Sequence, residues 1–290
     1  MPESVELPKT KAKSLLEQYG LRAKKGLGQH FLVDSRVLKR IVAAAELAPE
    51  DTVVEVGPGL GILTQELVQH AGRVTAVEAD PEMVSALDRL VVRSPNLTVV
   101  HGDIMQINPV SLLSSPGTGR TSATYKVVAN IPYYITSAVL RHFLEASCPP
   151  TLMVVMVQKE VGHTIVAQPG DMSLLAVSIQ FYGRPFIVAR VPARSFYPPP
   201  KVDSVILRID VYDKLPVAVP SARAFFDTAR AGFSAPRKQL RNSLAQGLVI
   251  GTQEAAALLQ RAGIDPRRRA ETLRIEEWGR LCRERHCLES

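Results

Sequence analysis

The chain has 290 residues, a mass of 31.7 kDa and a formal net charge of +7, and 46% of its residues are hydrophobic. These values are typical of a globular protein with one large domain, or with a large and a small one. The longest apolar run, at 152–157, is far too short to span a bilayer, and the lysine-rich residues 1–30 lack the apolar core of a secretory signal. Cys148, Cys282 and Cys287 form no C-x-x-C pair, so we expect free thiols and no bound metal. The expected location is the cytoplasm, without membrane association.

The charge is distributed unevenly along the chain. Residues 1–40 carry nine basic against four acidic residues, a net charge of +5. Residues 41–183 carry seven against thirteen, a net of −6, and residues 184–290 carry nineteen against eleven, a net of +8. Two basic flanks therefore enclose an acidic middle. Such flanks suit a polyanion such as nucleic acid, and a solvated basic surface explains them equally well.

Short β-branched runs alternate with helical patterns in the first half of the chain. Five apolar runs are typical of buried strands, at residues 52–56, 73–78, 97–101, 125–130 and 151–157. Three segments between them have apolar residues three and four apart, as helices do, at 61–71, 81–92 and 136–146. This alternation predicts an α/β fold with a parallel sheet covered on both faces. We expect residues 173–182 and 203–211 to add further strands and residues 115–119 to form a loop insertion.

The pattern changes after Lys214. Four further segments are helical and are separated by Gly or Pro, at 221–233, 237–248, 252–263 and 274–285. A linker is expected at 214–220. The sequence thus predicts two domains, an α/β catalytic domain at 1–213 and a small all-helical domain at 214–290.

The first predicted strand runs directly into the glycine-rich turn EVGPGLGILT (55–64). Gly57, Gly59 and Gly61 stand where a parallel strand turns into a helix, and there a missing β-carbon lets the backbone approach a ligand closely. Their G-x-G-x-G spacing differs from the G-x-G-x-x-G of dinucleotide-binding folds. Taken alone, the turn is as compatible with a structural loop as with a ligand site.

Acidic residues follow the next two strands. Glu78 ends the second strand, twenty-one residues after Gly57, where a carboxylate can accept hydrogen bonds from two ribose hydroxyls. Asp103 follows the third strand and could contact an adenine ring. Each acid alone is more often a surface cap than a ligand. Because ligands bind at the carboxyl edge of parallel sheets, the three successive strand ends together predict a cofactor with an adenosine group.

The fourth strand ends at Asn130, and Ile131-Pro132-Tyr133-Tyr134 follow it. An Asx-type turn with a tyrosine in the core would explain these residues, but not their place beside the cofactor edge. The exocyclic amine of adenine is a poor nucleophile. The Asn130 side-chain oxygen and a backbone carbonyl of the turn could accept its two hydrogens and orient its lone pair. Tyr133 offers a face for stacking an extruded base, worth about 1–3 kcal/mol. The pattern therefore favours methyl transfer to an adenine amine from a sulfonium donor.

Over nearly its whole length, the chain resembles the ribosomal RNA adenine dimethyltransferase family of the kasugamycin-sensitivity (KsgA) type. The stretches that carry the resemblance are KKGLGQHFL (24–32), EVGPGLGILT (55–64), VEAD (77–80), GD (102–103), NIPYYI (130–135), SFYPPPKVDS (195–204), RKQLRNSL (237–244) and AETLRIEEW (270–278). The resemblance implies a Rossmann-like S-adenosylmethionine domain joined to a small helical one. It also implies dimethylation of the N(6) amines of two adjacent adenines in the 3′-terminal hairpin of 16S rRNA, with a role in small-subunit biogenesis.

By this resemblance, the site residues fall into two groups. The residues expected to bind S-adenosyl-L-methionine are His30, Leu32, Gly57, Glu78, Asp103 and Asn130. The residues expected to act on the target base are Asn130, Tyr133 and Phe196, although an apolar plug beside a proline-stiffened loop explains Phe196 equally well. Gln29 is expected to help shape the pocket. The product would be S-adenosylhomocysteine, and no metal is expected.

The expected partner is small-subunit rRNA in a pre-ribosomal particle, bound by a monomeric enzyme through phosphate contacts. The candidate phosphate ligands are Lys24, Lys25, Arg237, Lys238, Arg241 and Arg267 to Arg269. Two departures bear on the RNA: isoleucine at 131 is common in erythromycin-resistance methylases of 23S rRNA, and Ala235-Pro236 stands where the family often has further basic residues. Two alternatives stay open, a 23S rRNA adenine methyltransferase of that type and a non-catalytic ribosome-assembly or RNA-binding factor.

Overall fold

The structure is a computed structural model that describes most of the chain. The described residues are 16–18, 20–24, 26, 28–91, 94–113 and 124–289. The predicted loop insertion at 115–119 and the predicted phosphate ligand Lys25 lie outside these residues.

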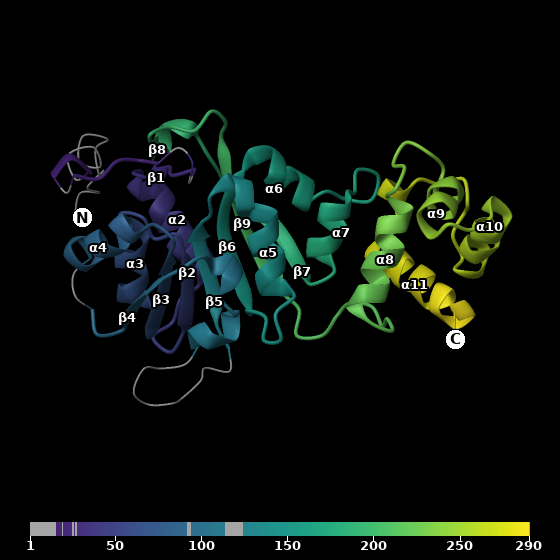
Figure 1. The fold of residues 1–290 in the computed structure, drawn as a ribbon, viewed down its shortest axis with the longest axis horizontal. Helices are drawn as coiled ribbons and strands as arrows, with labels where there is room; N and C mark the ends of the chain where they lie inside the picture. The colour runs from purple at the N-terminus through teal and green to yellow at the C-terminus, as the bar shows by residue number, and fades with distance from the viewer. Residues whose placement is uncertain are drawn as a thin grey trace. The chain divides into compact units, whose positions relative to one another are not determined.

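Seven strands form one sheet in the order β4-β3-β2-β5-β6-β9-β7 (Figure 1). Their bounds are β2 (Thr52–Val56), β3 (Arg73–Glu78), β4 (Leu97–His101), β5 (Lys126–Asn130), β6 (Leu152–Gln158), β7 (Gly183–Val191) and β9 (Ser204–Val211). The five strands from β4 to β6 are mutually parallel, whereas β9 runs antiparallel to β6. The five strands predicted in the first half of the chain are confirmed, and so is the strand predicted at 203–211.

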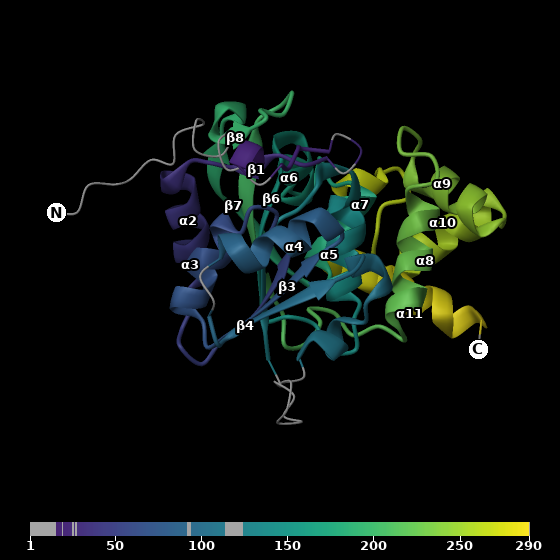
Figure 2. The same ribbon diagram turned by 60° about the vertical axis from the view of Figure 1, so that its left-hand side comes forward.

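Helices cover both faces of the sheet, as the continuous apolar strands require. Their bounds are α2 (Ser35–Ala45), α3 (Ile62–His70), α4 (Pro81–Leu90), α5 (Thr136–Leu144) and α6 (Lys159–Ile165). Apolar residues of α2 and α3 pack with Val53, Val74 and Val128 of the sheet in one buried cluster, and α5 lies across the sheet from them (Figure 2). Helix α4 lies beside the start of α3, where Leu87 and Val91 adjoin Gly61. The three helices predicted between the strands are thus confirmed.

The sheet register brings the predicted site strands to one edge. Val56 pairs with Val77, and Glu78 pairs with His101, so β2, β3 and β4 end side by side. Strand β5 lies next to β2 and ends at Asn130. Because these strands are parallel, the residues that follow them gather at the same carboxyl edge.

A second, two-stranded sheet joins a segment that precedes the main sheet in the chain to a segment between β7 and β9. Strand β1 (Phe31–Leu32) pairs antiparallel with β8 (Phe196–Tyr197), with Phe31 opposite Tyr197 and Leu32 opposite Phe196. Phe31, Leu32 and Phe196 are all buried. The short 3-10 helices are η2 (Ile104–Gln106), η3 (Pro109–Leu113), η4 (Tyr133–Ile135), η5 (Ala193–Ser195) and η6 (Ala270–Thr272).

The strand predicted at 173–182 is wrong, because this segment forms helix α7 (Leu174–Gln180). The Ser173 side chain caps the helix by accepting a hydrogen bond from the backbone N–H of Ala176 at 3.1 Å. Residues 176–179 are all buried, so the segment is enclosed on every side and shows no helical periodicity in its sequence. A short apolar run of this kind fits a buried strand and a buried helix alike.

Helices dominate the C-terminal part of the chain, as predicted. They are α8 (Ala222–Gly232), α9 (Leu240–Leu248), α10 (Thr252–Arg261) and α11 (Ile275–Glu289). The chain divides into two compact units, one of residues up to Gly162 with Pro185–Val211, the other of His163–Arg184 with Tyr212–Ser290. Residues 163–184, which precede the predicted boundary at 213, thus group with the C-terminal helices.

The helical unit has its own core. Trp278 is fully buried and its ring stacks on that of Phe233, and Phe181 stacks on Phe225 at a ring-centroid distance of 4.1 Å. No helix in the described part of the chain has both the length and the apolar character needed to cross a membrane.

Candidate active site

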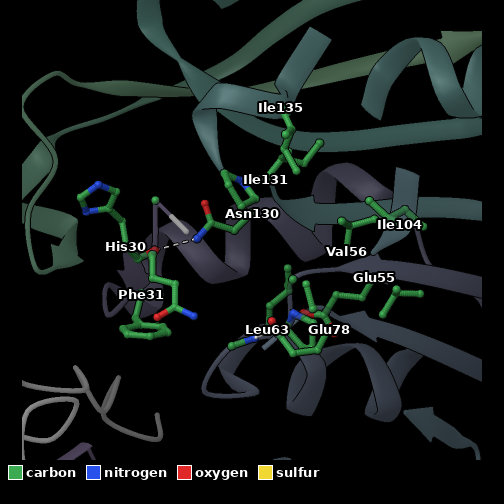
Figure 3. A pocket seen from close by; sticks show the side chains of 18 of the residues that line it. His30, Phe31, Glu55, Val56, Leu63, Glu78, Ile104, Asn130, Ile131 and Ile135 are labelled. Carbon is green, nitrogen blue, oxygen red and sulfur yellow. Dashed lines mark hydrogen bonds between the residues drawn. The ribbon is translucent and has the colours of Figure 1, made fainter. Parts of the chain in front are cut away.

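A cavity of about 320 Å³ opens at the carboxyl edge of the main sheet (Figure 3). Its walls come from five stretches of chain, at Gly28–Leu32, Glu55–Leu63, Val77–Ala79, Gly102–Met105 and Asn130–Ile135. All of these lie at strand ends, except for the first, which is the segment leading into β1. Of the residues predicted to bind the cofactor, His30, Leu32, Gly57, Glu78, Asp103 and Asn130 all line this cavity.

The glycine turn between β2 and α3 forms part of the cavity wall. Gly57, Gly59 and Gly61 have φ angles of 68°, 54° and 70°, in the left-handed region that side chains disfavour. A β-carbon on Gly59 would also lie 3.0 Å from the ring of Phe31. The turn therefore needs glycine for both backbone conformation and space.

Glu78 ties this turn to the end of β3. It is 6% exposed, and its Oε2 accepts a hydrogen bond from the Gly59 N–H at 3.1 Å while its Oε1 accepts one from the Asp80 N–H at 2.9 Å. Burial raises the pKa of Glu78 from its ordinary value, against the lowering effect of these two bonds. Asp103, by contrast, is exposed at the end of β4, and its Oδ1 accepts from the Met105 N–H at 2.9 Å.

Glu55 is a second buried acid at this cavity, and the sequence analysis missed it. It is 1% exposed, and its Oε2 has no hydrogen-bond partner among the described residues. Burial raises the pKa of Glu55 to about 8, against a lowering by the Thr64 side chain, and the nearby Glu78 acts in the same direction as burial. The available signal was a carboxylate inside the otherwise apolar strand TVVEV, one residue before the end of that strand.

The Asn130 side chain is held by a backbone carbonyl of the segment that leads into β1. Its Nδ2 donates a hydrogen bond to the carbonyl oxygen of His30 at 2.9 Å, across a separation of 100 residues (Figure 3). This bond fixes the amide orientation. The Oδ1 atom accepts no hydrogen bond from the described residues and stays available as an acceptor beside the cavity.

Two aromatic rings stand together next to Asn130. The rings of His30 and Tyr133 stack with centroids 5.9 Å apart and an interplanar angle of 24°. His30 Nδ1 hydrogen-bonds to the Pro198 carbonyl at 2.8 Å, and Tyr133 Oη is 2.6 Å from Ser204 Oγ. Burial raises the pKa of Tyr133, which therefore stays a neutral phenol at neutral pH. Tyr134, also a cavity residue, is 66% exposed.

Phe196 is the one predicted site residue that the structure does not bring to the cavity lining. Its side chain is fully buried in the same core cluster as Leu32, which is its partner in the β1–β8 pair. Gln29, predicted to shape the pocket, does line the cavity. It reaches the end of β3 by donating from Nε2 to Asp80 Oδ2 at 3.1 Å. Asp80, with 1% exposure, is a further residue that the sequence analysis left without a role.

The fold and the site together define a class. A parallel sheet with a glycine turn, an acid at the next strand end and an adenosine-sized cavity at the carboxyl edge belongs to the Rossmann-like methyltransferases that use S-adenosylmethionine. The ribosomal RNA adenine dimethylase family matches residues 20–285 of the chain. The chain belongs to this family.

Individual relatives agree with this membership. A protein of Dehalococcoides mccartyi named ribosomal RNA small subunit methyltransferase A is 54% identical over 93% of this chain and 91% of its own length. A protein of the same name from Moorella thermoacetica is 42% identical over 93% of this chain and 95% of its own length.

Solved structures show the same fold. The 23S rRNA methyltransferase ErmE is 29% identical with a TM-score of 0.68, covering 88% of this chain and 98% of its own. A dimethyladenosine transferase from Plasmodium falciparum has a TM-score of 0.73 at 24% identity, covering 87% and 96% of the two chains.

Proposed function

We propose that this protein transfers methyl groups from S-adenosylmethionine to the N(6) amines of two adjacent adenines in the 3′-terminal hairpin of 16S rRNA. The observation that carries the chemistry is the Asn130 amide, whose Nδ2 is engaged by the His30 carbonyl and whose Oδ1 is left as an acceptor at the cavity. The small subunit as substrate is supported by the names of the relatives that are 42–54% identical.

The residues around the cavity suit the cofactor. Glycines at 57 and 59 leave room for close approach to the backbone, and Glu78 and Asp103 stand at successive strand ends. The buried Oε2 of Glu55, which has no hydrogen-bond partner among the described residues, adds negative potential or a hydrogen-bonding group to a cavity that would take a cation. S-adenosylmethionine would supply an electrophilic methyl group on a positively charged sulfur. His30 and Leu32 would close the cavity from the side of β1.

The chain's own part in the reaction is orientation. Asn130 Oδ1, with a backbone carbonyl of the Ile131–Pro132 turn, would accept the two hydrogens of the adenine amine and favour a lone pair directed at the methyl group. Tyr133 would offer an aromatic face to the extruded base. Its hydroxyl is bonded to Ser204, so it would act through its ring and not as a base. A contact between Phe196 and the base stays a prediction, and the buried ring supports the wall behind Leu32.

The proposal includes a cytoplasmic monomer acting on a pre-ribosomal particle, with S-adenosylhomocysteine as product. A second candidate is methylation of 23S rRNA, favoured by the 29% identity to ErmE. A third is an assembly factor that binds RNA without transfer.

One experiment separates these candidates. Unmethylated small and large ribosomal subunits are incubated side by side with radiolabelled S-adenosylmethionine, and the modified base is identified by mass spectrometry. Dimethyladenosine in the small subunit alone is the expected result. Label in the large subunit would favour 23S rRNA, and bound cofactor without label in either subunit would favour an assembly factor.

A further inference from the structure

The segment Gly28–Leu32 has two tasks at the site but little regular structure of its own. It forms one wall of the cavity, and its His30 carbonyl holds the Asn130 amide. Only Phe31 and Leu32 belong to a strand. The orientation of Asn130 therefore depends on whatever anchors the residues just before β1.

Asp80 supplies that anchor from the end of β3. Its Oδ1 accepts a hydrogen bond from Lys24 Nζ at 2.8 Å, and its Oδ2 accepts one from Gln29 Nε2 at 3.1 Å. The Asp80 N–H donates to Glu78 Oε1 at 2.9 Å, and Oδ1 also caps α4 by accepting from the Glu82 N–H at 3.0 Å. One buried carboxylate thus joins the acid of the cofactor site to the segment that holds Asn130.

The anchored residues also brace one another. The Lys24 N–H donates to Gln29 Oε1 at 2.8 Å, and Lys24 Nζ lies 3.1 Å from Glu82 Oε2. Although burial acts to raise it, hydrogen bonds from Lys24 and Gln29 hold the pKa of Asp80 below its usual range. Asp80 is therefore ionised at neutral pH, and its two oxygens act only as acceptors.

We propose that Asp80 is a positioning residue for methyl transfer, which acts by fixing Lys24 and Gln29 and so the His30 carbonyl that orients Asn130. Asp80 is absent from the cavity lining and works through the segment Gly28–Leu32. With this segment loose, the Asn130 amide would be free to rotate and present its NH₂ group, a donor, where the adenine amine needs an acceptor. Only the activity part of this inference rests on the proposed function.

The first test is Asp80→Asn. Asparagine is as good an N-cap as aspartate, so helix α4 keeps its cap. The new amide NH₂ faces the donor Gln29 Nε2, however, and the anchor fails. We expect faster hydrogen exchange at the backbone amides of residues 28–32. We also expect kcat to fall by about ten- to a hundredfold, with a smaller change in the dissociation constant of S-adenosylmethionine.

Asp34→Asn is the matched control. Asp34 also caps a helix, accepting from the Arg36 N–H at 3.0 Å, and its second oxygen accepts from Ser195 Oγ at 2.9 Å. It has no bond to residues 28–32. We expect its kcat to stay within about twofold of the native value, as for most substitutions away from a site.

A second variant tests the hydrogen bond between Gln29 and Asp80 by exchanging its donor and acceptor. Gln29→Glu alone would place two carboxylates together and loosen the segment. Combined with Asp80→Asn, it would let the new amide at position 80 donate a hydrogen bond to the new carboxylate at position 29. The double variant should recover slow exchange at residues 28–32, and kcat should recover with it.

The outcomes are decisive in each arm. Native exchange in Asp80→Asn, or a double variant no better than the single ones, would overturn the anchor. Fast exchange with native kcat would overturn its role in positioning Asn130. If even the native protein transfers no methyl group, the proposed function fails, while exchange in the double variant still decides the anchor.

Discussion

At the scale of single residues, two acids share one cavity under opposite local conditions. Glu78 has both oxygens bonded to backbone N–H groups, whereas Glu55 keeps an unpartnered Oε2 among the described residues. Burial raises the pKa of both groups, and that of Glu55 reaches about 8. An acid protonated at neutral pH is a hydrogen-bond donor and carries no charge, so Glu55 can donate a hydrogen bond into the cavity while no cation is bound there.

The raised pKa of Glu55 should make the free energy of unfolding depend on pH. Because its pKa is raised from 4.5 to about 8, the unfolded chain ionises in this window while the folded protein stays protonated. The contribution of Glu55 to the free energy of unfolding is therefore fully present below pH 4.5 and is lost as the pH rises to about 8. Glu55→Gln should flatten the slope of unfolding free energy between about pH 5 and 7.5 by up to about 1.4 kcal/mol per pH unit.

Chemical denaturation across this pH range measures the slope. The exposed Glu50→Gln serves as the control and should leave the slope unchanged. Glu78 contributes in the same direction as Glu55, so some slope should persist in Glu55→Gln. A slope equal to the native one would mean that Glu55 is ionised in the folded protein.

Gly59 lends itself to a second residue-scale prediction. In Gly59→Ala, the new β-carbon meets the Phe31 ring at 3.0 Å and the backbone keeps a φ of 54°. Gly263 has a φ of 69° with nothing within 4 Å, so Gly263→Ala isolates the backbone strain. Both variants should lose about 1 kcal/mol of stability. Only Gly59→Ala should also weaken S-adenosylmethionine binding in calorimetry, because Gly59 and Phe31 both line the cavity and a shift of the ring changes its shape. Equal binding by the two variants would contradict the steric argument.

The site residues differ in how far the sequence could predict them. Gly57, Glu78, Asp103 and Asn130 were predictable because each one follows or ends a strand recognisable from its own apolar run. The anchor at Asp80 was not, because its partner Gln29 lies 51 residues away in a segment with almost no regular structure. A buried acceptor and its distant donors leave no periodic pattern in sequence.

At the scale of elements, burial and proline explain two errors in the predicted fold. Helix α7 is buried on all sides and was taken for a strand, whereas β7 at Gly183–Val191 was overlooked. The residues of β7 alternate between exposed and less exposed positions, as a strand requires. The strand begins GRPF, however, and a proline argues against a strand. The proline is tolerated because β7 is an edge strand of the sheet.

The end of α9 holds a residue in an unfavourable conformation. Val249 has a φ of 59° and a ψ of 44° at the helix C-cap, and its side chain is 91% exposed. A β-branched residue in the left-handed region is strained, whereas glycine is the usual choice there. Val249→Gly should therefore raise the free energy of unfolding by about 1 kcal/mol.

Urea denaturation of the native protein, Val249→Gly and Val249→Ala tests this expectation. Alanine keeps a β-carbon, so most of the strain remains and its gain should be the smaller one. Loss of stability in Val249→Gly would show that the exposed valine makes contacts outweighing its backbone strain.

At the scale of the whole molecule, two groups of basic residues in the helical unit differ in their ion pairs. Arg267, Arg268 and Arg269 are each within 4.0 Å of a carboxylate, on Asp265, Glu277 and Glu271 respectively. In the described part of the chain, no carboxylate pairs with Arg237, Lys238 or Arg241. Three basic residues that pair with no carboxylate of the described residues therefore stand close together in the chain at the start of α9.

This uneven compensation predicts which residues set the salt dependence of RNA binding. Replacing Arg237, Lys238 and Arg241 with Gln should reduce the magnitude of the slope of log K for RNA binding against log salt by about two. Each phosphate contact that is lost no longer releases its counterion on binding. Arg280, Arg283 and Arg285 are the matched control, with the same loss of three charges. Arg280 and Arg283 donate to the carbonyls of Ala262 and Ala218, so they are held within the protein. Titrations with small-subunit rRNA at several salt concentrations give both slopes. Equal reductions would mean that net charge alone governs the attraction and that the start of α9 is no phosphate site.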